Sequence, residues 1–163
     1  MTSAAAGHRI RRARWRELGA IRQLLDAAYA PQLEMHERQR LQKLHLWWLI
    51  LYRYLWVLES RQGLIGTICL QDTSMHIYVS LVSVLPGLQR SGFGRVLMEF
   101  AETQARQRGF GRLSLTTPEK FVNAIAFYLH LGFVEIGRGE MNGHAVVDLL
   151  KRLDAIPPRP ASA

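Results

Sequence analysis

Hydrophobic residues recur along the chain with two different periods, and these periods predict its strands and helices. The run Ile77–Val84 consists mostly of β-branched, aliphatic and aromatic residues, which is typical of a buried strand, and Pro86 lies just beyond its end. Over residues 96–105 the apolar positions are spaced three or four apart, which predicts an amphipathic helix that ends at Gly109. A glycine-bearing turn, Gln89–Gly94, joins them, so the centre of the chain is a strand, a turn and a helix.

The residues before this centre predict a short edge strand and two helices. The edge strand covers Arg9–Ala13, where an apolar residue alternates with arginines. A helix over Trp15–Tyr29 is broken by Pro31 and carries one apolar stripe, formed by Leu18, Ile21, Leu24, Leu25 and Ala28. A second helix begins near Leu33, and its apolar face comprises Leu41, Leu44, His45, Trp48, Leu51 and Tyr52.

The most hydrophobic run, residues 44–58, does not predict a membrane span. It is shorter than the roughly 20 residues that a span needs, and a histidine and an arginine interrupt it. We therefore divide it into the end of the second helix and a strand over Tyr54–Glu59. Trp47 and Ile50 lie off the apolar face, where core packing is the favoured interpretation and a substrate mouth or partner surface the alternative.

The remaining elements complete one domain. Strands are predicted over Leu64–Gln71, Arg112–Thr116, Phe133–Ile136 and Ala145–Leu150, the last two joined by a turn over Gly139–Gly143. A helix over Lys120–Leu131 directs Ala124, Phe127, Tyr128 and Leu131 inward. No linker divides the chain, so we expect a single domain over residues 8–153, with disordered tails at 1–7 and 154–163.

Composition narrows the class of protein. With 163 residues, 48% of them hydrophobic and 21% charged, the chain is expected to be a soluble globular protein. Its single cysteine, Cys69, lies in an apolar run, which predicts a buried, inert thiol and a reducing, cytoplasmic location. The six histidines lack metal-ligand spacing, so we expect no metal. The net charge of +8 favours a solvated basic surface, and no motif for binding DNA or RNA is present.

The turn between the central strand and helix has the chemistry of a phosphate site. The first N–H groups of a helix have no intrahelical partner, and the helix dipole is positive there. Gly92 and Gly94 lack a Cβ atom, so a pyrophosphate can approach the backbone closely. The turn is not a Walker loop, because no Lys-Ser or Lys-Thr follows the glycines. It is not the dinucleotide fingerprint either, because Leu97 stands where a small residue is needed.

Two segments resemble the GNAT superfamily of N-acyltransferases. Gln89-Arg90-Ser91-Gly92-Phe93-Gly94 is similar to the acetyl-CoA signature Q/R-x-x-G-x-G/A, which follows a strand and a proline. Residues 124–133 resemble the segment A-x-x-x-Y-x-x-x-G-F. The resemblance implies an α/β (α+β) GNAT fold: a mixed, mostly antiparallel central sheet of about six to seven strands, splayed in the middle and flanked by about four helices.

The resemblance implies an acyltransferase enzyme that uses acetyl-CoA as cosubstrate and acetylates a primary amine of a small molecule or of a protein or peptide. Transfer would be direct, within a ternary complex. A bulge would splay the central strand, whose backbone would pair with the pantetheine arm, and the N–H groups of the turn would hold the pyrophosphate. The implied coenzyme-binding residues are Val82, Ser83, Val84, Gln89, Arg90, Ser91, Gly92, Phe93, Gly94 and Arg95.

The resemblance also implies that Tyr128 is the catalytic acid, because a phenol can protonate the departing thiolate. The general base stays open. Relatives carry a glutamate at one of two positions, which are Tyr78 and Thr116 here. Other candidates are a water chain and the side chains of Glu34, His36, Asp72 and His76. Where many relatives have an asparagine that touches the coenzyme, this chain has Phe121, and Asn123 is one turn misplaced.

Two further questions stay open at this level. A GNAT-like scaffold that binds coenzyme A without turnover, as a sensor or a protein-interaction module, is the alternative to an enzyme. The region Tyr29–Tyr54 would form much of the acceptor wall, and its Trp47, Trp48 and Tyr52 favour an apolar or aromatic acceptor. Beyond the coenzyme and the amine we expect no nucleic-acid or membrane partner, and a homodimer is compatible with the sequence.

Overall fold

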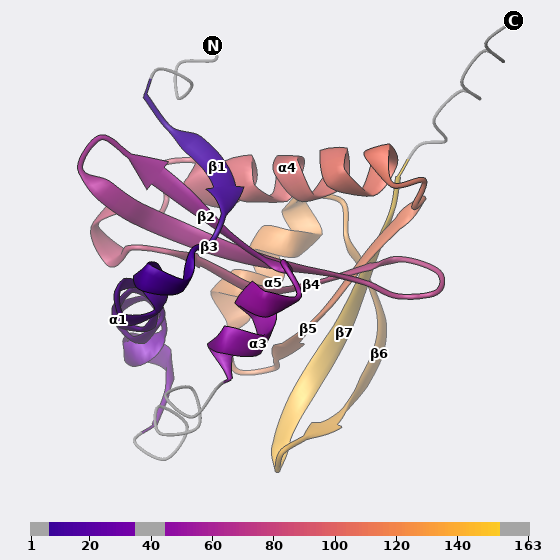
Figure 1. Ribbon diagram of the computed structural model, residues 1–163. Helices are drawn as coiled ribbons and strands as arrows, with labels where there is room; N and C mark the ends of the chain where they lie inside the picture. Colours follow the sequence, from indigo (N-terminus) through magenta and orange to yellow (C-terminus); the bar gives the residue numbers. More distant parts are fainter. Residues whose placement is uncertain (1–6, 35–44, 154–163) are drawn as a thin grey trace, which may run out of the picture. The chain divides into compact units, whose positions relative to one another are not determined.

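A computed structural model describes residues 7–34 and 45–153 of the 163-residue chain (Figure 1). The α-helices among these residues are α1 (Leu18–Tyr29), α3 (Leu46–Leu51), α4 (Phe93–Gln107) and α5 (Val122–His130). Three short 3-10 helices are η1 (Trp15–Glu17), η2 (Ala30–Gln32) and η3 (Pro86–Leu88). The strands are β1 (Arg9–Arg12), β2 (Leu55–Ser60), β3 (Gly63–Asp72), β4 (Ile77–Val84), β5 (Arg112–Pro118), β6 (Val134–Met141) and β7 (His144–Arg152).

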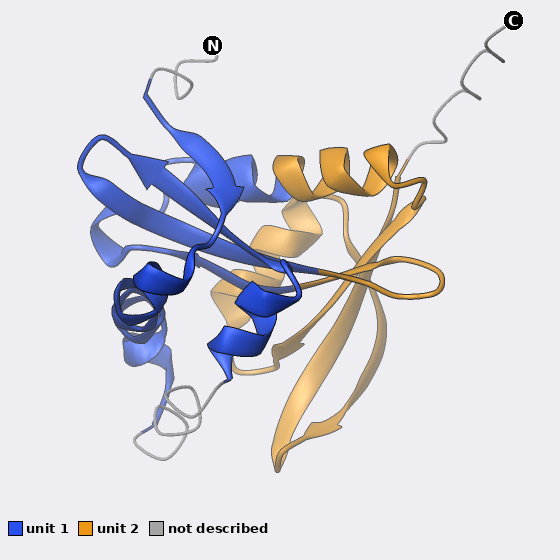
Figure 2. Ribbon diagram, viewed as in Figure 1, with its two compact units in different colours: residues 1–70, 80–98 blue, residues 71–79, 99–163 orange. Residues whose placement is uncertain are grey.

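The chain divides into two compact units (Figure 2). Unit 1 comprises residues 1–70 and 80–98, and unit 2 comprises residues 71–79 and 99–163. The strands β3 and β4 and the helix α4 contribute residues to both units. The elements nevertheless follow the predicted order, and the predicted central strand, Ile77–Val84, is confirmed with the same bounds.

The seven strands form one sheet in the order β1-β2-β3-β4-β5-β7-β6. β1 pairs with β2, β2 with β3, β5 with β7 and β6 with β7, all antiparallel, while β4 pairs with β5 in parallel. The prediction of a mixed, mostly antiparallel sheet is thus confirmed. The β4–β5 ladder contains two residue pairs, Ile77 with Leu113 and Tyr78 with Ser114, so it ends before the second half of β4.

The core of unit 1 lies beneath α1. The apolar stripe predicted for this helix is confirmed at Ile21, Leu24, Leu25 and Ala28, which are all buried. Ile21 and Leu25 belong to one cluster with buried residues of α3, β2 and β3, including Cys69. Burial raises the pKa of the Cys69 thiol to about 11, which confirms the prediction of a buried, inert cysteine. No helix in the described part of the chain is long and apolar enough to cross a membrane.

The face predicted for the second helix is wrong where the structure describes it. In α3 the buried side chains are Leu46 and Ile50, whereas Trp48, Leu51 and Tyr52 are about half exposed. Residues 46–51 read LWWLIL, so this short helix has no polar face from which its orientation could be predicted. The prediction of core packing is confirmed for Ile50 but is wrong for Trp47, which is 39% exposed. Leu41 and Leu44, which were predicted on the same face, lie outside the described residues.

In unit 2 the strand β5 alternates as its sequence predicts, but the last hairpin is longer than expected. In β5, Leu113, Leu115 and Thr117 are buried, while Ser114 and Thr116 are half-buried. The predicted turn over Gly139–Gly143 is too wide, because β6 continues through residues 139–141. A two-residue turn closes the hairpin, with φ of 54° at Asn142 and 79° at Gly143, as a type I′ turn requires.

Candidate active site

The second half of β4 begins with an unusual backbone conformation at Leu81. Its φ is 49°, in the left-handed region that residues other than glycine rarely adopt. The buried Thr67 of β3 donates its hydroxyl proton to the carbonyl oxygen of Leu81, at 2.8 Å. The hydroxyl oxygens of Thr67 and Ser83 are 2.6 Å apart, and because Thr67 has only one proton, Ser83 donates in this second bond. The two hydroxyl groups therefore hold the irregular backbone in place.

Beyond Leu81, one edge of β4 faces β3 and the other edge is supported by side chains. The N–H of Leu85 donates to the carbonyl oxygen of Ile65 in β3, at 2.9 Å. Backbone groups alternate along a strand, so those of Val82 and Val84 point to the opposite edge. There the carbonyl oxygen of Val82 accepts a hydrogen bond from the Tyr29 hydroxyl at 3.0 Å, and that of Val84 accepts one from Nε2 of Gln89 at 3.1 Å.

The sequence predicts that Tyr29 begins the acceptor region, but it does not predict a hydrogen-bond partner for its hydroxyl. Tyr29 is the last residue of α1, and burial raises the pKa of its phenol to about 12. The hydroxyl therefore stays protonated at neutral pH and can donate to the carbonyl of Val82. The only sequence signal was a tyrosine at the end of an apolar stripe, immediately before the Ala-Pro of η2.

Gly66 is required where β3 approaches β4. A Cβ atom on Gly66 would lie 2.8 Å from the backbone oxygen of Ser83, which is shorter than the contacts that Cβ atoms make in proteins. Leu97 of α4 and Leu58 of β2 would lie 3.4 Å and 3.6 Å away. The glycine thus allows three elements to meet behind the strand segment that contains Val82, Ser83 and Val84.

The turn before α4 presents its backbone to solvent. Gly92 has φ of 88°, and no atom lies within 4 Å of the place where its Cβ would be. The first intrahelical hydrogen bond runs from the N–H of Val96 to the carbonyl of Gly92, at 3.1 Å. The N–H groups of Phe93, Gly94 and Arg95 come before this bond and have no intrahelical acceptor. This donor set and the open space at Gly92 fit a diphosphate group. The side chains of Arg90, Ser91 and Arg95 are exposed around it.

Two predicted coenzyme-binding residues use their side chains elsewhere. The Gln89 side chain closes the turn by bonding to Val84, as described above. The Phe93 ring is 9% exposed and packs against the His8 ring, with centroids 4.8 Å apart. From Phe93, therefore, only the backbone N–H is available to a ligand.

Tyr128, the predicted catalytic acid, lies in unit 2. It is 8% exposed, and its ring centroid is 5.3 Å from that of Phe127 and 5.7 Å from that of Phe133. Its backbone carbonyl accepts the N–H of Phe133, at 3.1 Å, where the chain leaves α5. Its role as proton donor stays a prediction. Phe121 is 8% exposed in the same unit, and Asn123 is exposed.

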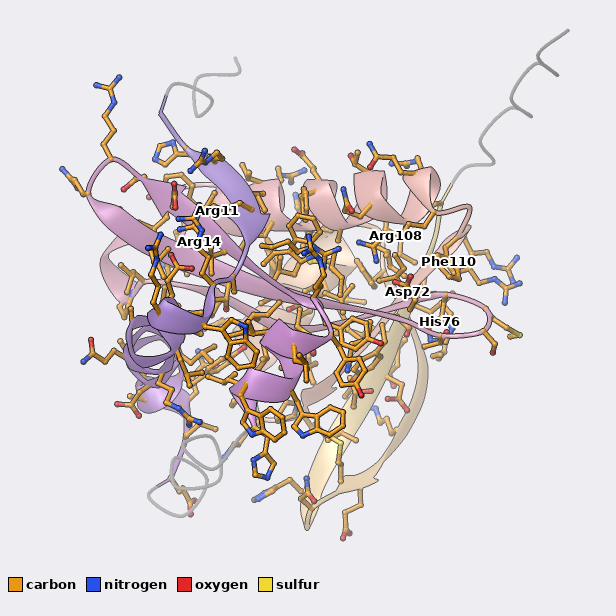
Figure 3. All side chains as sticks on the ribbon, viewed as in Figure 1. Arg11, Arg14, Asp72, His76, Arg108 and Phe110 are labelled. Carbon is orange, nitrogen blue, oxygen red and sulfur yellow. The ribbon has the colours of Figure 1, made fainter. Side chains whose placement is uncertain are left out.

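The carboxylates and histidines considered as bases have differing surroundings. Asp72 accepts a hydrogen bond from Nη1 of Arg108 at 2.6 Å, and Figure 3 shows the two side chains next to each other near His76. The backbone N–H and carbonyl of His76 both bond to the hydroxyl of Thr73. His36 lies outside the described residues, and Glu34 is exposed.

Thr116, one of the two positions where a carboxylate was expected, has a carboxylate beside it. Its hydroxyl donates to Oδ1 of Asp148 at 2.6 Å, and the two residues are register partners on β5 and β7. Sequence reasoning missed Asp148, because its neighbour lies 32 positions away along the chain. No group of three or more His, Cys, Asp or Glu residues that could hold a metal occurs within residues 7–34 and 45–153.

Comparison with known proteins places this chain in a family. The sequence model described as "Acetyltransferase (GNAT) family" matches residues 18–133, which include the turn before α4 and all of α5. The chain belongs to the GNAT family of acetyltransferases. Its predicted resemblance to this family is thereby confirmed.

Curated GNAT relatives match parts of the chain. N-alpha-acetyltransferase 80 of Mus musculus is 45% identical over 62 residues, which are 38% of this chain and 18% of that protein. Probable N-acetyltransferase 14 of Xenopus tropicalis is 27% identical over 115 residues, which are 69% of this chain and 56% of that protein. The GNAT chain thus spans about a fifth and just over half of the lengths of these relatives.

Solved structures share the fold of this GNAT chain. The PaiA N-acetyltransferase of Thermoplasma acidophilum, solved in complex with coenzyme A, has a TM-score of 0.77 at 16% identity and covers 89% of this chain and 98% of that one. The ribosomal-protein-S18-alanine N-acetyltransferase of Escherichia coli has a TM-score of 0.69 at 19% identity and covers 96% of this chain and 99% of that one. The predicted GNAT fold is confirmed.

Proposed function

We propose that this protein transfers the acetyl group of acetyl-CoA directly to a primary amine in a ternary complex. The observation that carries the proposal is the edge of β4 in unit 1. Its backbone beyond the left-handed Leu81 is fixed by the side chains of Thr67 and Tyr29 rather than left to vary. An extended arm such as pantetheine can pair with such an edge as an added strand does. The open turn at Gly92 supplies the donors for the diphosphate that follows the arm.

The chemistry needs three contributions from the chain. The amine must lose a proton before its nitrogen attacks the thioester carbonyl carbon. A backbone N–H of β4, that of Val84 or a near neighbour, would stabilise the oxygen as it gains charge. When the carbon–sulfur bond breaks, Tyr128 would give its proton to the thiolate and recover one from solvent. A phenol with an ordinary pKa near 10 is a suitable acid for a thiolate whose conjugate thiol has a pKa near 8.5.

For the acceptor we propose the α-amino group of a protein or peptide ahead of a small-molecule amine. The names of two of the similar proteins refer to N-alpha-acetyl transfer and to an alanine of ribosomal protein S18. The exposed aromatic residues of unit 1 offer a surface for the first side chains of such a peptide. The rings of Trp48 and Tyr52 are stacked with centroids 4.8 Å apart, and Trp47 lies beside Trp48 at 5.2 Å. Trp47→Ala with Trp48→Ala is expected to raise the acceptor KM without changing the acetyl-CoA KM.

The first experiment tests the coenzyme site by calorimetry. The parent is expected to bind acetyl-CoA, and Gly92→Glu to bind it at least a hundredfold more weakly, because the added carboxylate fills the open space and repels the phosphates. Gly109→Glu is the matched control. It adds the same charge at an exposed glycine of unit 2 that also has a left-handed φ, of 81°, and open space at its Cβ position. Equal affinity in Gly92→Glu and Gly109→Glu would refute the site.

The second experiment tests turnover. Acetyl-CoA is incubated with a lysine-free peptide that has a free amino end, with an N-blocked peptide that contains one lysine, and with an aliphatic diamine. Acetylated product and released coenzyme A are followed by mass spectrometry. Product from the first peptide alone supports an α-amino acceptor. Product from the lysine peptide or from the diamine would instead show that the acceptor is a lysine side chain or a small-molecule amine. Coenzyme binding without any product would instead support the alternative, a non-catalytic sensor.

A further inference from the structure

Asp148 has no cation beside it among the described residues, whereas Glu102, the other half-buried carboxylate described in unit 2, pairs with Lys151 and Arg106. Asp148 lies half-buried on β7, between β5 and β6 in the sheet. Asp72 pairs with Arg108, and Glu135 pairs with Arg138. For Asp148, the hydroxyl of Thr116 is the one side-chain partner in the part of the chain that the structure describes. A half-buried carboxylate without a counter-ion is costly to maintain, which marks it as a candidate for function.

The strands on either side leave one oxygen of this carboxylate anchored and the other open. Oδ1 accepts the hydroxyl proton of Thr116, at 2.6 Å. On the other side the register partner is Gly137 of β6, which has no side chain. A Cβ atom on Gly137 would reach ordinary contact with Oδ2, at 3.7 Å. The glycine therefore keeps Oδ2 uncovered from the side of β6.

The carboxylate belongs to a polar strip on one face of the strands of unit 2. Tyr78 of β4 is the register partner of Ser114, and Ser114 is two residues from Thr116, so all three side chains point to one face. Asp148 joins them as the partner of Thr116. The alternate residues of β5 are buried on the opposite face, whereas Tyr78, Ser114, Thr116 and Asp148 are all only half-buried. A substrate amine can therefore reach the strip without disturbing the core.

We propose that Asp148 is the general base of the acetyl transfer. This rests on the proposed function above. The carboxylate takes one proton from the ammonium form of the acceptor, either directly or through a water molecule. The neutral nitrogen then attacks the thioester carbon and loses its second proton to solvent as the carbon–sulfur bond breaks. The thiolate takes a proton from Tyr128, which recovers one from solvent, and Asp148 releases its own proton to solvent. Overall, an ammonium ion and acetyl-CoA give an amide, coenzyme A and one proton. Thr116 is a positioning residue, because its hydroxyl fixes the rotamer of the carboxylate.

Asp148→Asn is the test, because an amide oxygen can still accept the Thr116 hydroxyl while the basic oxygen is lost. With saturating peptide at pH 7, kcat is expected to fall about a hundredfold, the lower range of general-base contributions. The affinity for acetyl-CoA should stay within about twofold of the parent, since the base acts on the amine. The deficit in kcat should shrink about tenfold by pH 9, where a peptide α-amine with a pKa of about 8 is already neutral. Glu140→Gln removes an exposed carboxylate from the same hairpin and is expected to change none of these values.

Each outcome decides the proposal. A parent-like kcat in Asp148→Asn, or a deficit of the same size at pH 7 and pH 9, would overturn it while leaving the acetyltransferase function intact. A parent that binds acetyl-CoA but acetylates no amine would overturn both. If Asp148→Asn does not fold, Thr116→Val keeps the carboxylate and removes only its anchor. Its kcat is then expected to fall about tenfold with unchanged coenzyme affinity, and a parent-like kcat would refute the assigned geometry.

Discussion

Gly66→Ala perturbs, from the side of β3, the segment of β4 that is proposed to hold the coenzyme. The new methyl group would lie 2.8 Å from the backbone oxygen of Ser83, roughly 0.6 Å short of ordinary van der Waals contact. Neither partner is a flexible side chain, because one is β3 itself and the other is the backbone of β4. Leu97 and Leu58 close the space on the remaining sides, at 3.4 Å and 3.6 Å. The two strands must therefore separate to accommodate the methyl group.

The cost follows from the packing. Overfilling a well-packed interior typically costs about 1–3 kcal/mol. For a protein of this size, each kcal/mol shifts Tm by about 2–4 °C, so a cost of about 2 kcal/mol, the middle of this range, should lower the Tm of Gly66→Ala by about 4–8 °C. The displacement also moves Ser83 relative to Thr67, and the hydrogen bond between these hydroxyl groups positions the neighbouring N–H groups. We therefore expect the affinity for acetyl-CoA to fall about tenfold, about 1.4 kcal/mol.

Differential scanning fluorimetry and calorimetry measure the two effects. Gly19→Ala is the matched control, because Gly19 lies in α1 with no atom within 4 Å of its Cβ position. Alanine is favoured over glycine in a helix by about 0.5–1 kcal/mol, so this control should raise Tm and leave coenzyme binding unchanged. A Gly66→Ala protein with parental Tm and parental affinity would show that β3 and β4 are not held at the distance described.

Two further predictions concern the supports of unit 1. Thr67→Val removes the hydroxyl that donates to the carbonyl of Leu81, so we expect weaker acetyl-CoA binding and faster hydrogen exchange at the Leu85 amide. Thr67→Ser should restore both properties. A parental exchange rate in Thr67→Val would show that the Thr67 hydroxyl does not stabilise this part of β4. Hydrogen bonds from Arg11, labelled in Figure 3, lower the pKa of Glu17 and of Glu59. Because these folded-state pKa values lie below the ordinary value of about 4.3, their stabilisation is present above that pH and is lost as pH falls further. The Tm of Arg11→Met should therefore fall less steeply than that of the parent between pH 5 and pH 3, and parallel curves would contradict the assignment.

Features that depend on neighbours in sequence could be predicted. The strand Ile77–Val84 has one apolar run, and the helix after it has one apolar stripe, so both follow from local patterns. The turn that is proposed to hold the diphosphate is also recognisable, because its glycines and the helix start lie within six residues. Where a local pattern had no polar side, as in α3, the prediction of the buried face was wrong. The prediction of a turn over Gly139–Gly143 is likewise too wide, because glycine permits both turn and strand conformations and β6 continues to Met141.

The parts that could not be predicted depend on contacts between distant residues. Tyr29 and Val82 are 53 positions apart, and Thr116 and Asp148 are 32 apart. Nothing in the residues around Asp148 distinguishes it from an ordinary strand carboxylate until the register of β5 and β7 is known. The expected base position was therefore interpreted as lacking a carboxylate, although the neighbouring strand supplies one.

Because the single cysteine is buried, the reactivity of its thiol reports when the strands of unit 1 separate. Cys69 is fully enclosed in β3, so an aromatic disulfide reagent should leave the folded chain unlabelled while reacting at once with any coenzyme A set free. The rate of slow labelling of the protein itself would then measure how often the strands of unit 1 separate and expose the sulfur. Protection of that sulfur by acetyl-CoA, at increasing concentration, would measure how far the ligand suppresses this separation.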